Sequence, residues 1–310
     1  MITPTRSPQV AFVPMRAQVA RIHEVSPTFR RFTLTGPEIA TVADNRLDQR
    51  FKILFPTPTA GLDAMPLDDE WYAAWRELDN DARPPMRTYT VREVRSESAE
   101  FDVDIAVHGR LGPASSWALD ARPGDEIVVC VPHTGFAGDF HGGIDFRPPA
   151  GVERILIAAD ETALPAVSGI LERFPASATG IAVIEVPHAD DAAALAVPPP
   201  GVEVRVVARG QDPTGTLLVP AVQQAAETVL APSTGSTEAF EDIDIEAGIL
   251  WDVPTDAAGN PLLERGPFYA WLAGEASPIK QLRRHLVRDR GVDRRSVAFM
   301  GYWRAGRPEM

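Results

Sequence analysis

The sequence contains one cysteine, Cys130, and no apolar stretch that approaches the length of a membrane span. A single cysteine excludes an internal disulfide, so the chain gives no sign of an oxidising compartment. Its 43 acidic residues outnumber its 30 basic ones and leave a net charge of −13. That charge argues against non-specific nucleic-acid binding and against adhesion to an anionic membrane. Because the first residues, MITPTRSPQV, also lack a signal-peptide pattern, we expect a cytoplasmic protein with no integral membrane segment.

A tight metal-binding pattern is also missing. His133 and His141 flank Asp139 in a glycine-rich loop, but their spacing matches no zinc site. A polar surface loop accounts for these residues, and we expect no metal bound by the protein itself.

The first half of the chain alternates apolar and polar residues, as half-buried strands do. Residues 101–108 place four apolar side chains on one face and turn Asp102, Asp104 and His108 to the other. Residues 51–55 turn Lys52 away from three apolar side chains. Further strands are predicted at 30–35 and 126–131, and a short helix at about 70–78. Strands separated by Gly/Pro turns predict a small antiparallel β-barrel or sandwich.

The pattern changes near residues 148–151, where Pro and Gly predict a linker. Beyond it, apolar strands alternate with amphipathic helices, which predicts an α/β doubly wound (Rossmann-like) parallel sheet. The expected strands are 155–159, 181–186, 202–208, 268–273 and 297–302, and the expected helices are about 163–174, 216–230 and 278–290. We expect Ser277 to cap the last helix, and residues 233–248 to form an acidic surface loop. The two predicted domains cover residues 1–147 and 152–310.

The stretch Arg87-Thr88-Tyr89-Thr90 carries the first chemical signal. In a strand, Arg87 and Tyr89 share one face, and Thr88 and Thr90 share the other. A guanidinium suits a phosphate, an aromatic face suits a planar ring, and a hydroxyl can bond to ring heteroatoms. A flavin dinucleotide offers all three groups. An ordinary strand with a surface Arg and a packed Tyr is the alternative.

The second signal is Gly112-Pro-Ala-Ser-Ser-Trp-Ala118, at an expected turn from strand to helix. Free backbone N–H groups and a hydroxyl at such a turn can hold a pyrophosphate. Alternatively, Ser115 only caps the helix and Trp117 only fills the core.

These two stretches resemble the flavin motifs R-x-Y-[ST] and G-x-x-[ST] of the ferredoxin–NADP reductase superfamily. Six segments together resemble the siderophore-interacting protein family of FAD-containing ferric-siderophore reductases: R-T-Y-T-V-R at 87–92, D-I-A-V-H-G at 104–109, G-P-A-S-S-W-A at 112–118, D-E-T-A-L-P-A at 160–166, A-G-E at 273–275 and G-Y-W-R-x-G at 301–306. The resemblance runs from about Val19 to Gly306.

The resemblance implies an FAD site in which Arg87 binds a phosphate, Tyr89 packs on the isoalloxazine and Thr90 lies near the polar edge of the ring. The full implied set of cofactor-binding residues is Arg87, Thr88, Tyr89, Thr90, Asp104, His108, Gly112, Ala114, Ser115, Trp117, Asp160, Thr162 and Ala163. Of these, Asp160 and Thr162 would approach the adenine end of FAD. No catalytic side chain is implied, because the flavin carries the chemistry.

Two features depart from ordinary ferredoxin–NADP reductases. A Gly-rich loop is replaced by Asp160-Glu161-Thr162, whose carboxylates suit a helix dipole but would repel a dinucleotide pyrophosphate. The motif that carries a cysteine near the end of ferredoxin–NADP reductases reads Ala273-Gly274-Glu275 here, so that cysteine is missing. Members of the siderophore-interacting protein family also tend to carry a Trp-Leu-x-Arg segment, and this chain retains only its arginine, Arg209. NADH or NADPH as the co-substrate therefore rests on the resemblance.

A ferric siderophore is often anionic, so its pocket should be locally basic. Nine Lys and Arg residues but two acids lie between Lys280 and Arg307, and Lys52 lies on a barrel strand. We take Lys52, Lys280 and Arg304 as candidate substrate-binding residues, with a solvated helix face as the alternative. Three other functions stay open: a reductase for another acceptor, a reductase that receives electrons from ferredoxin, and a siderophore carrier without redox activity.

Overall fold

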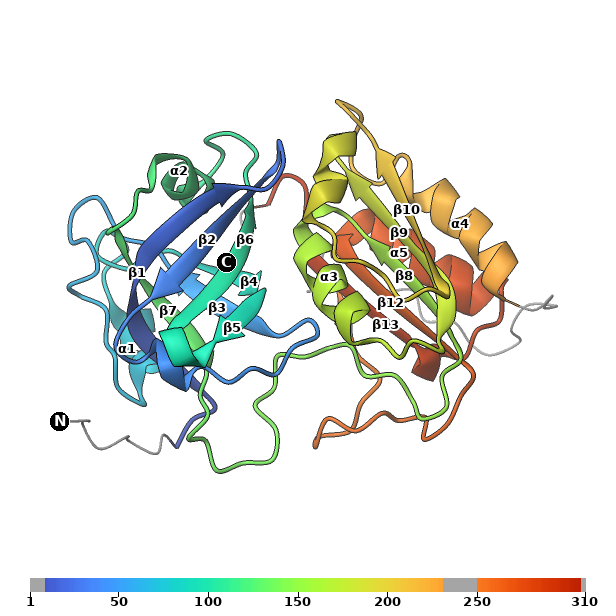
Figure 1. Cartoon of the computed structure of the whole chain (residues 1–310), viewed down its shortest axis with the longest axis horizontal. Coiled ribbons are helices and arrows are strands. Elements are labelled where there is room, and N and C mark those ends of the chain that lie inside the picture. The colour runs from blue at the N-terminus through green and yellow to red at the C-terminus, as the bar shows by residue number, and fades with distance from the viewer. Residues whose placement is uncertain (1–8, 231–249, 308–310) are drawn as a thin grey trace. The chain divides into compact units, whose positions relative to one another are not determined.

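The computed structural model describes residues 9–230 and 250–307, which form two compact units that divide between Gly143 and Ile144 (Figure 1). The predicted acidic loop at 233–248 lies outside the described residues. Within the described ranges, no helix combines the length and the apolar character needed to cross a membrane.

Unit 1 is built on a curled antiparallel sheet of seven strands in the order β4-β3-β7-β1-β2-β6-β5. The strands are β1 (Phe12–Glu24), β2 (Phe29–Thr35), β3 (Arg50–Leu54), β4 (Met86–Thr90), β5 (Glu93–Arg95), β6 (Glu100–Ala106) and β7 (Glu126–Pro132). Because β4 and β5 are its two edges, the sheet is a half-barrel rather than the expected barrel. The 13-residue β1, which the sequence analysis did not predict, is the spine of the sheet and pairs with both β2 and β7.

The predicted alternation sets the inner face of the half-barrel. Phe51, Ile53 and Phe101 are fully buried there, together with side chains from β1, β2 and β7. The long segment between β3 and β4 carries α1 (Trp71–Glu77), close to the predicted helix, and covers part of the outer face with a second cluster around Trp71 and Leu54. Both faces of β3 are therefore apolar at its end.

Unit 2 has a six-stranded sheet in the order β10-β9-β8-β12-β13-β11. Its strands are β8 (Arg154–Ala159), β9 (Thr179–Val186), β10 (Val202–Ala208), β11 (Trp251–Asp252), β12 (Phe268–Glu275) and β13 (Val297–Trp303). The first five in this order are parallel, as predicted, but the edge strand β11 runs antiparallel to β13. The sheet is therefore mixed rather than wholly parallel, because a two-residue edge strand leaves no periodic signal in the sequence.

Helices cover both faces of this sheet. In Figure 1, α3 (Leu164–Arg173) lies on one face, and α4 (Leu218–Val229) and α5 (Ala276–Arg284) lie on the other, where they pack on alternate residues of the central strands. The strand order reverses between β8 and β12. In open α/β sheets, ligands bind beyond the carboxyl ends of the strands at such a reversal.

The start of α5 differs from the prediction. Its N-cap is Glu275, not Ser277, and the Glu275 carboxylate accepts a hydrogen bond from the Ser277 backbone N–H at 2.7 Å. The helix then continues as a π-helical turn, His285–Asp289, and ends before Gly291, which has a φ of 66° as expected for a helix stop. A Glu at the N-cap reaches the same first-turn amide that a shorter side chain would.

Candidate functional site

The Arg87–Thr90 stretch forms β4, the edge strand of unit 1. Its faces are those predicted: Tyr89 packs against the inner core, whereas Thr88 accepts a hydrogen bond from Lys52 Nζ at 2.5 Å on the outer side. The Arg87 guanidinium donates to the carbonyl of Met86 at 2.8 Å and is half-buried. Arg87 and Tyr89 therefore share the face that turns toward the inner core, and Thr90 is buried at the end of the strand.

The second motif forms the start of α2 (Pro113–Asp120). Gly112 is its N-cap, and no side chain caps the helix, so the suggestion that Ser115 is the cap is wrong. Apart from Gly112 and its two chain neighbours, no heavy atom lies within 4 Å of the position where Gly112 would carry a Cβ. The N-terminus of α2 at Gly112 therefore borders open space, and a helix terminus in such a place can bind an anion.

Phe55 connects the two motifs. Its ring centroid lies 6.5 Å from that of Tyr89 and 5.4 Å from that of Trp117, which also contacts Phe32 at 5.2 Å. These separations are normal for packed aromatic pairs. The edge strand with Arg87 and the helix with Ser115 are therefore fastened to one aromatic cluster, although about 25 residues separate them in sequence.

Two predicted residues of the same unit are placed differently. The Asp104 carboxylate is buried and accepts two hydrogen bonds from Arg31, at 2.7 and 2.8 Å, with Arg92 3.9 Å away. His108 lies beyond the end of β6 and is exposed, so it does not share a strand face with Asp104. Asp104 thus stabilises the sheet from its outer face, and His108 belongs to the loop that leads into α2.

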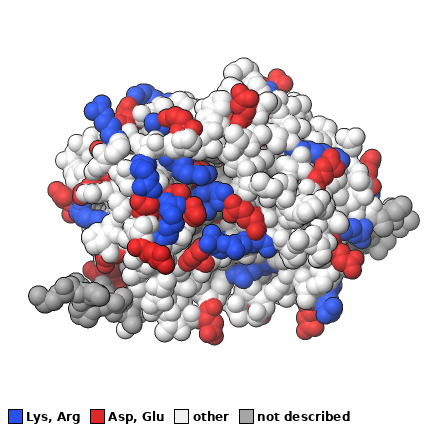
Figure 2. All heavy atoms as spheres, in the orientation of Figure 1, with Lys and Arg blue, Asp and Glu red and all other residues white. Residues whose placement is uncertain are grey.

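Asp104 belongs to an ion-pair network that the sequence analysis missed. Arg95 binds Asp102 through two hydrogen bonds, at 2.7 and 2.9 Å, and Thr33 donates a third at 2.7 Å. Burial by itself raises the pKa of Asp102, but the bonds from Arg95 and Thr33 outweigh it and leave the pKa below its usual value. In Figure 2, acidic and basic side chains lie interleaved over the face of unit 1 that carries β2, β5 and β6.

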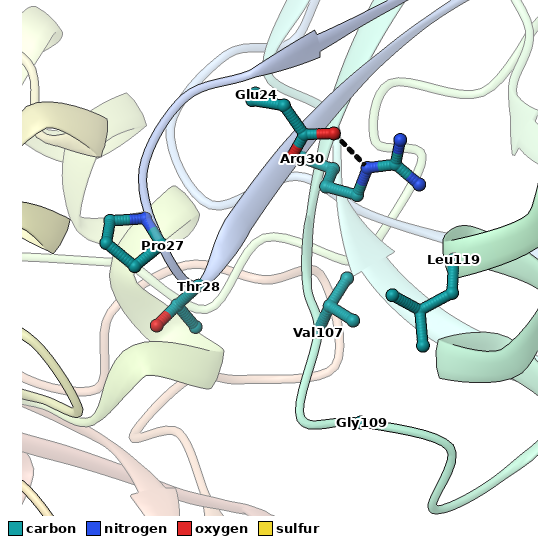
Figure 3. Close-up of a pocket in the computed structure, with 7 residues that line it drawn as sticks. All are labelled: Glu24, Pro27, Thr28, Arg30, Val107, Gly109 and Leu119. Carbon is teal, nitrogen blue, oxygen red and sulfur yellow. Dashed lines mark hydrogen bonds and ion pairs between the residues drawn. The ribbon is translucent and has the colours of Figure 1, made fainter.

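A hollow of about 370 Å³ lies beside the loop that carries His108 (Figure 3). It is lined by Glu24, Pro27, Thr28, Arg30, Val107, Gly109 and Leu119. Arg30 connects two sides of the hollow, since its guanidinium donates a hydrogen bond to the Glu24 carboxylate at 2.6 Å and another to the carbonyl of Ala118 in α2. The loop after β6, which contains the end of the segment D-I-A-V-H-G, therefore forms one wall of this cavity.

In unit 2, Asp160 is fully buried at the end of β8. Its Oδ1 accepts hydrogen bonds from the backbone N–H and hydroxyl of Thr162, at 2.9 and 2.5 Å, and its Oδ2 accepts from the Glu275 backbone N–H at 2.7 Å and from Trp303 Nε1 at 2.8 Å. Burial, followed by the nearby Glu161 carboxylate, raises the pKa of Asp160 to about 6. Three of the segments that suggested the family thus meet at one carboxylate.

The lack of a side chain at Gly274 allows β12 to approach the Asp160 carboxylate this closely. A Cβ on Gly274 would lie 2.7 Å from the carboxylate of Asp160, and the φ of 148° is itself unfavourable for other residues. The Glu275 carboxylate also accepts a hydrogen bond from the Ala305 backbone N–H at 3.1 Å, which fixes the chain just after Arg304. Asp160 is therefore a positioning residue that joins the ends of β8, β12 and β13.

The contacts of Glu161 bear on the expectation that the loop after β8 repels a pyrophosphate. Its carboxylate forms two hydrogen bonds to Arg209, both at 2.6 Å, and both side chains are largely buried. The expected repulsion of a pyrophosphate is reduced, because Arg209 neutralises Glu161 and the Asp160 carboxylate faces the interior. Ala163 is buried next to this loop, and Thr162 is half-buried.

The candidate cations are divided between the units. Lys52 lies on β3 of unit 1, and Lys280 on α5 and Arg304 just after β13 lie in unit 2. All three are half-buried. Lys280 and Arg304 lie close in the chain to Glu275 and Ala305, which the hydrogen bond above joins, so both belong to the carboxyl end of the unit 2 sheet.

The residues of unit 1 fit an FAD. The Arg87 guanidinium, the Ser115 hydroxyl and the open first turn of α2 are donors for phosphate oxygens, and Tyr89 supplies an aromatic face. Asp104, the acid among the predicted residues of this unit, is neutralised by Arg31. An anionic dinucleotide would therefore meet donors and a ring rather than free carboxylates.

Comparison with known proteins gives matches along most of the chain. Residues 18–136 match the family described as "Siderophore-interacting FAD-binding domain", and residues 152–306 match "Siderophore-interacting protein". An uncharacterized protein of Mycobacterium tuberculosis is 30% identical over 94% of this chain and 90% of its own length. The ferric vibriobactin reductase ViuB of Vibrio cholerae is 33% identical over 54% of this chain and 56% of its own length. The crystal structure of the siderophore-interacting protein SipS of Aeromonas hydrophila aligns with a TM-score of 0.65 at 28% identity, over 96% of this chain and 94% of that one.

Proposed function

Because this chain belongs to the siderophore-interacting protein family, within the ferredoxin–NADP reductase superfamily, we propose that it reduces Fe(III) in a siderophore with electrons from NADH or NADPH. Unit 1 holds FAD and unit 2, as a doubly wound domain of the nucleotide-binding type, receives the donor. The reaction takes place in the cytoplasm, where iron loss from the siderophore serves the cell.

The observation that carries this proposal is the aromatic cluster around Phe55. It fixes Tyr89 on the edge strand and Trp117 in α2, so that Arg87 and the first turn of α2 are held by one rigid core. Arg87, Ser115 and the amide near Ala114 would hold the pyrophosphate, Tyr89 would lie against the isoalloxazine, and Thr90 and Thr88 would lie near its edge. His108 and Gly112 would border the ribityl and phosphate groups.

Bound FAD would supply the conversion between a two-electron donor and one-electron acceptors. The overall reaction balances as one NAD(P)H and two ferric chelates giving NAD(P)⁺, one proton and two ferrous chelates. Hard oxygen ligands hold Fe(III) more strongly than Fe(II), so reduction loosens the metal. The protein needs no acid–base residue for this outcome, and its task is to position the reactants and to attract the chelate.

The cationic side chains serve the second task. Lys52 Nζ is held by Thr88, which lies between Arg87 and Tyr89 in the edge strand but points to the opposite face, so its charge is fixed on the outer side of the strand that carries the proposed flavin contacts. Lys280 and Arg304 add positive charge at the carboxyl end of the unit 2 sheet. A fixed positive charge near the acceptor site raises the local concentration of an anionic chelate in a protein of net charge −13.

The test is an absorption spectrum of the purified protein followed by an anaerobic assay. We expect oxidised-flavin bands at about one FAD per chain, and loss of ferric-siderophore absorbance when NADH or NADPH is added with a ferrous trap. A protein that binds the ferric chelate but takes up no FAD would instead be a carrier. Flavin reduction with transfer only to quinones or simple ferric chelates would indicate another acceptor, and electron transfer only from a reduced ferredoxin would replace the nicotinamide donor.

A further inference from the structure

The short helix α2 depends on the rest of unit 1 for its position. It has eight residues, of which Ala118 is buried, while Ala114 and Trp117 pack partly buried against the inner core. A helix of about two turns is not stable by itself in water, so contacts with the surrounding structure must fix where it lies. What these contacts imply rests on the proposed function, in which the first turn of α2 holds the pyrophosphate of FAD.

Arg30 of β2 binds α2 at its carboxyl end. Its guanidinium donates a hydrogen bond to the carbonyl of Ala118, in the last turn of the helix, and another to the Glu24 carboxylate at 2.6 Å. The carbonyls of a last helical turn lack partners within the helix, and a cation there also offsets the negative end of the helix dipole. In Figure 3, Arg30 extends toward the helix that carries Leu119. Arg30 therefore fastens the end of α2 to β2.

A second contact between Arg30 and α2 runs through two aromatic rings. The Arg30 guanidinium lies 5.8 Å from the centroid of the Phe32 ring, and that ring lies 5.2 Å from the ring of Trp117 in α2. Phe32 is fully buried, and the Arg30 side chain is 19% exposed. Because water has little access to Arg30, its bond to the Ala118 carbonyl is stronger than the same bond on an open surface. Arg30 thus holds both the backbone of α2 and the ring that supports Trp117.

Another arginine reaches the same end of α2 but is exposed. Arg110, in the loop before the helix, donates two hydrogen bonds of 2.7 Å to Asp120, the last residue of α2. The two side chains are 61% and 63% exposed. Exposed ion pairs contribute little to stability, because water and salt compete for them. Of these two arginines, Arg30 is therefore the one that can fix the helix.

We propose that Arg30 is a positioning residue for FAD: by holding the carboxyl end of α2, it keeps the first turn of the helix in place for the pyrophosphate. In this role Arg30 makes no contact with the cofactor. A rise of about 1.5 Å per residue puts the two ends of α2 about 12 Å apart, with Gly112 at the far end from Arg30. A helix that shifts along this axis presents its first amides to the phosphate oxygens at the wrong distance, and hydrogen bonds weaken steeply outside their normal range.

The test compares FAD with riboflavin, which has the same ring and ribityl chain but no phosphate. Arg30→Met keeps the packing over Phe32 and removes the donor to Ala118. It should raise the Kd for FAD about 5- to 50-fold, as expected for the indirect loss of a charged hydrogen bond, and leave the Kd for riboflavin unchanged within about twofold. Fluorescence quenching with the apoprotein measures both values. Arg21→Met is the matched control, because Arg21 also pairs with a carboxylate on this sheet, through two bonds of 2.8 Å that do not involve α2.

Amide hydrogen exchange reports on the helix itself. In the apoprotein, exchange within residues 113–120 should be faster in Arg30→Met than in the wild type and unchanged in Arg110→Met, while exchange in β1 and β7 stays the same in both. If Arg30→Met folds poorly, Arg30→Lys takes its place, because it keeps a cation beside Ala118 and should recover part of the affinity for FAD.

Three results would each overturn the inference: a wild-type Kd for FAD in folded Arg30→Met, an equal rise in the Kd for riboflavin, or unchanged exchange in α2. The proposed function is judged separately. Wild-type protein that takes up no FAD contradicts the proposed function, whereas wild-type protein that binds FAD as tightly as Arg30→Met does contradicts only the role of Arg30.

Discussion

The carboxylate of Asp160 accepts a hydrogen bond from the indole Nε1 of Trp303 at 2.8 Å, although 143 positions separate the two residues in the chain. The same oxygen accepts from the Glu275 backbone N–H. A single side chain at the end of β8 therefore holds the ends of β12 and β13 in register at their carboxyl edge, where Lys280 and Arg304 are also found. The arrangement of this edge depends on one buried acid.

Arg87→Ala should release FAD without unfolding the protein. The Arg87 guanidinium bonds inside the protein to a neighbouring carbonyl, so its removal costs the fold little. Loss of a charged hydrogen bond to a phosphate corresponds to about 1.5–3 kcal/mol, or a Kd for FAD that is about 10- to 150-fold higher. Flavin fluorescence quenching measures the Kd. Arg76→Ala, at an exposed position of α1, is the matched control and should leave it unchanged; equal affinity in both variants would remove Arg87 from the site.

Lys52→Gln should raise the KM for an anionic ferric siderophore and leave the FAD content unchanged. One screened charge near the substrate corresponds to about 0.5–1 kcal/mol, hence a KM that is about two- to fivefold higher at low salt. Arg122→Gln is the control, because it also removes one positive charge from unit 1, at an exposed position outside the proposed sites. If the KM of Lys52→Gln equals that of the wild type at low and at high salt, Lys52 does not attract the chelate.

Gly274→Ala should destabilise unit 2 more than Gly306→Ala does. Both glycines have positive φ, 148° and 77°, so each substitution brings backbone strain of about 1–3 kcal/mol. At Gly274 the new methyl group would also lie 2.7 Å from the carboxylate of Asp160, whereas the space around Gly306 is open. Urea denaturation followed by tryptophan fluorescence compares the two midpoints. Equal midpoints would mean that Asp160 can move aside.

The stability of unit 2 should fall as the pH rises from about 4 to about 6. The pKa of Asp160 is about 6 in the folded protein against an ordinary value of 3.8, so the folded state keeps the proton longer than the unfolded chain does. Below pH 4 both states are protonated and the stabilisation is complete, and above pH 6 it has been lost. A shift of about two units corresponds to about 3 kcal/mol.

Asp160→Asn provides the reference for this pH dependence because it cannot ionise. The free energy of unfolding of the wild type minus that of Asp160→Asn should decrease over this range in thermal or urea denaturation. A difference that increases with pH would show that the four hydrogen bonds to Asp160 hold the ionised carboxylate more strongly than burial opposes it.

Local patterns in the sequence predicted much of the fold. The alternation at Phe101, Val103 and Ile105 identified β6 and its inner face, because a strand has a period of two whatever surrounds it. The strands of unit 2 were visible as continuous apolar runs and its helices as apolar residues at helical spacing. The antiparallel β11 and the open edges of the half-barrel were not, since both are set by which strands meet in space.

In the candidate site, too, local motifs were visible in the sequence and long-range contacts were not. Arg87 and Gly112 could be named as candidates because each lies in a short motif whose chemistry is local. The contacts of Glu161 with Arg209, and of Glu185 with the start of α4, could not, because they join residues about 30 to 50 positions apart. A buried carboxylate in the sequence gives no sign of whether a ligand or the chain itself will balance its charge.

The segment between β3 and β4 begins and ends at one point of the sheet, because Leu54 pairs with Met86 and the backbone N–H of Phe55 donates to the carbonyl of Pro85 at 2.9 Å. A chain that leaves and returns at one place can change in length without moving the strands that carry it. Trp71 and its neighbours nevertheless shield Leu54, Val128 and Cys130. An engineered protein in which a short turn replaces this segment would keep its strand register but expose the apolar side chains beneath it, and such a surface promotes aggregation. The segment therefore protects the outer face of the sheet from self-association.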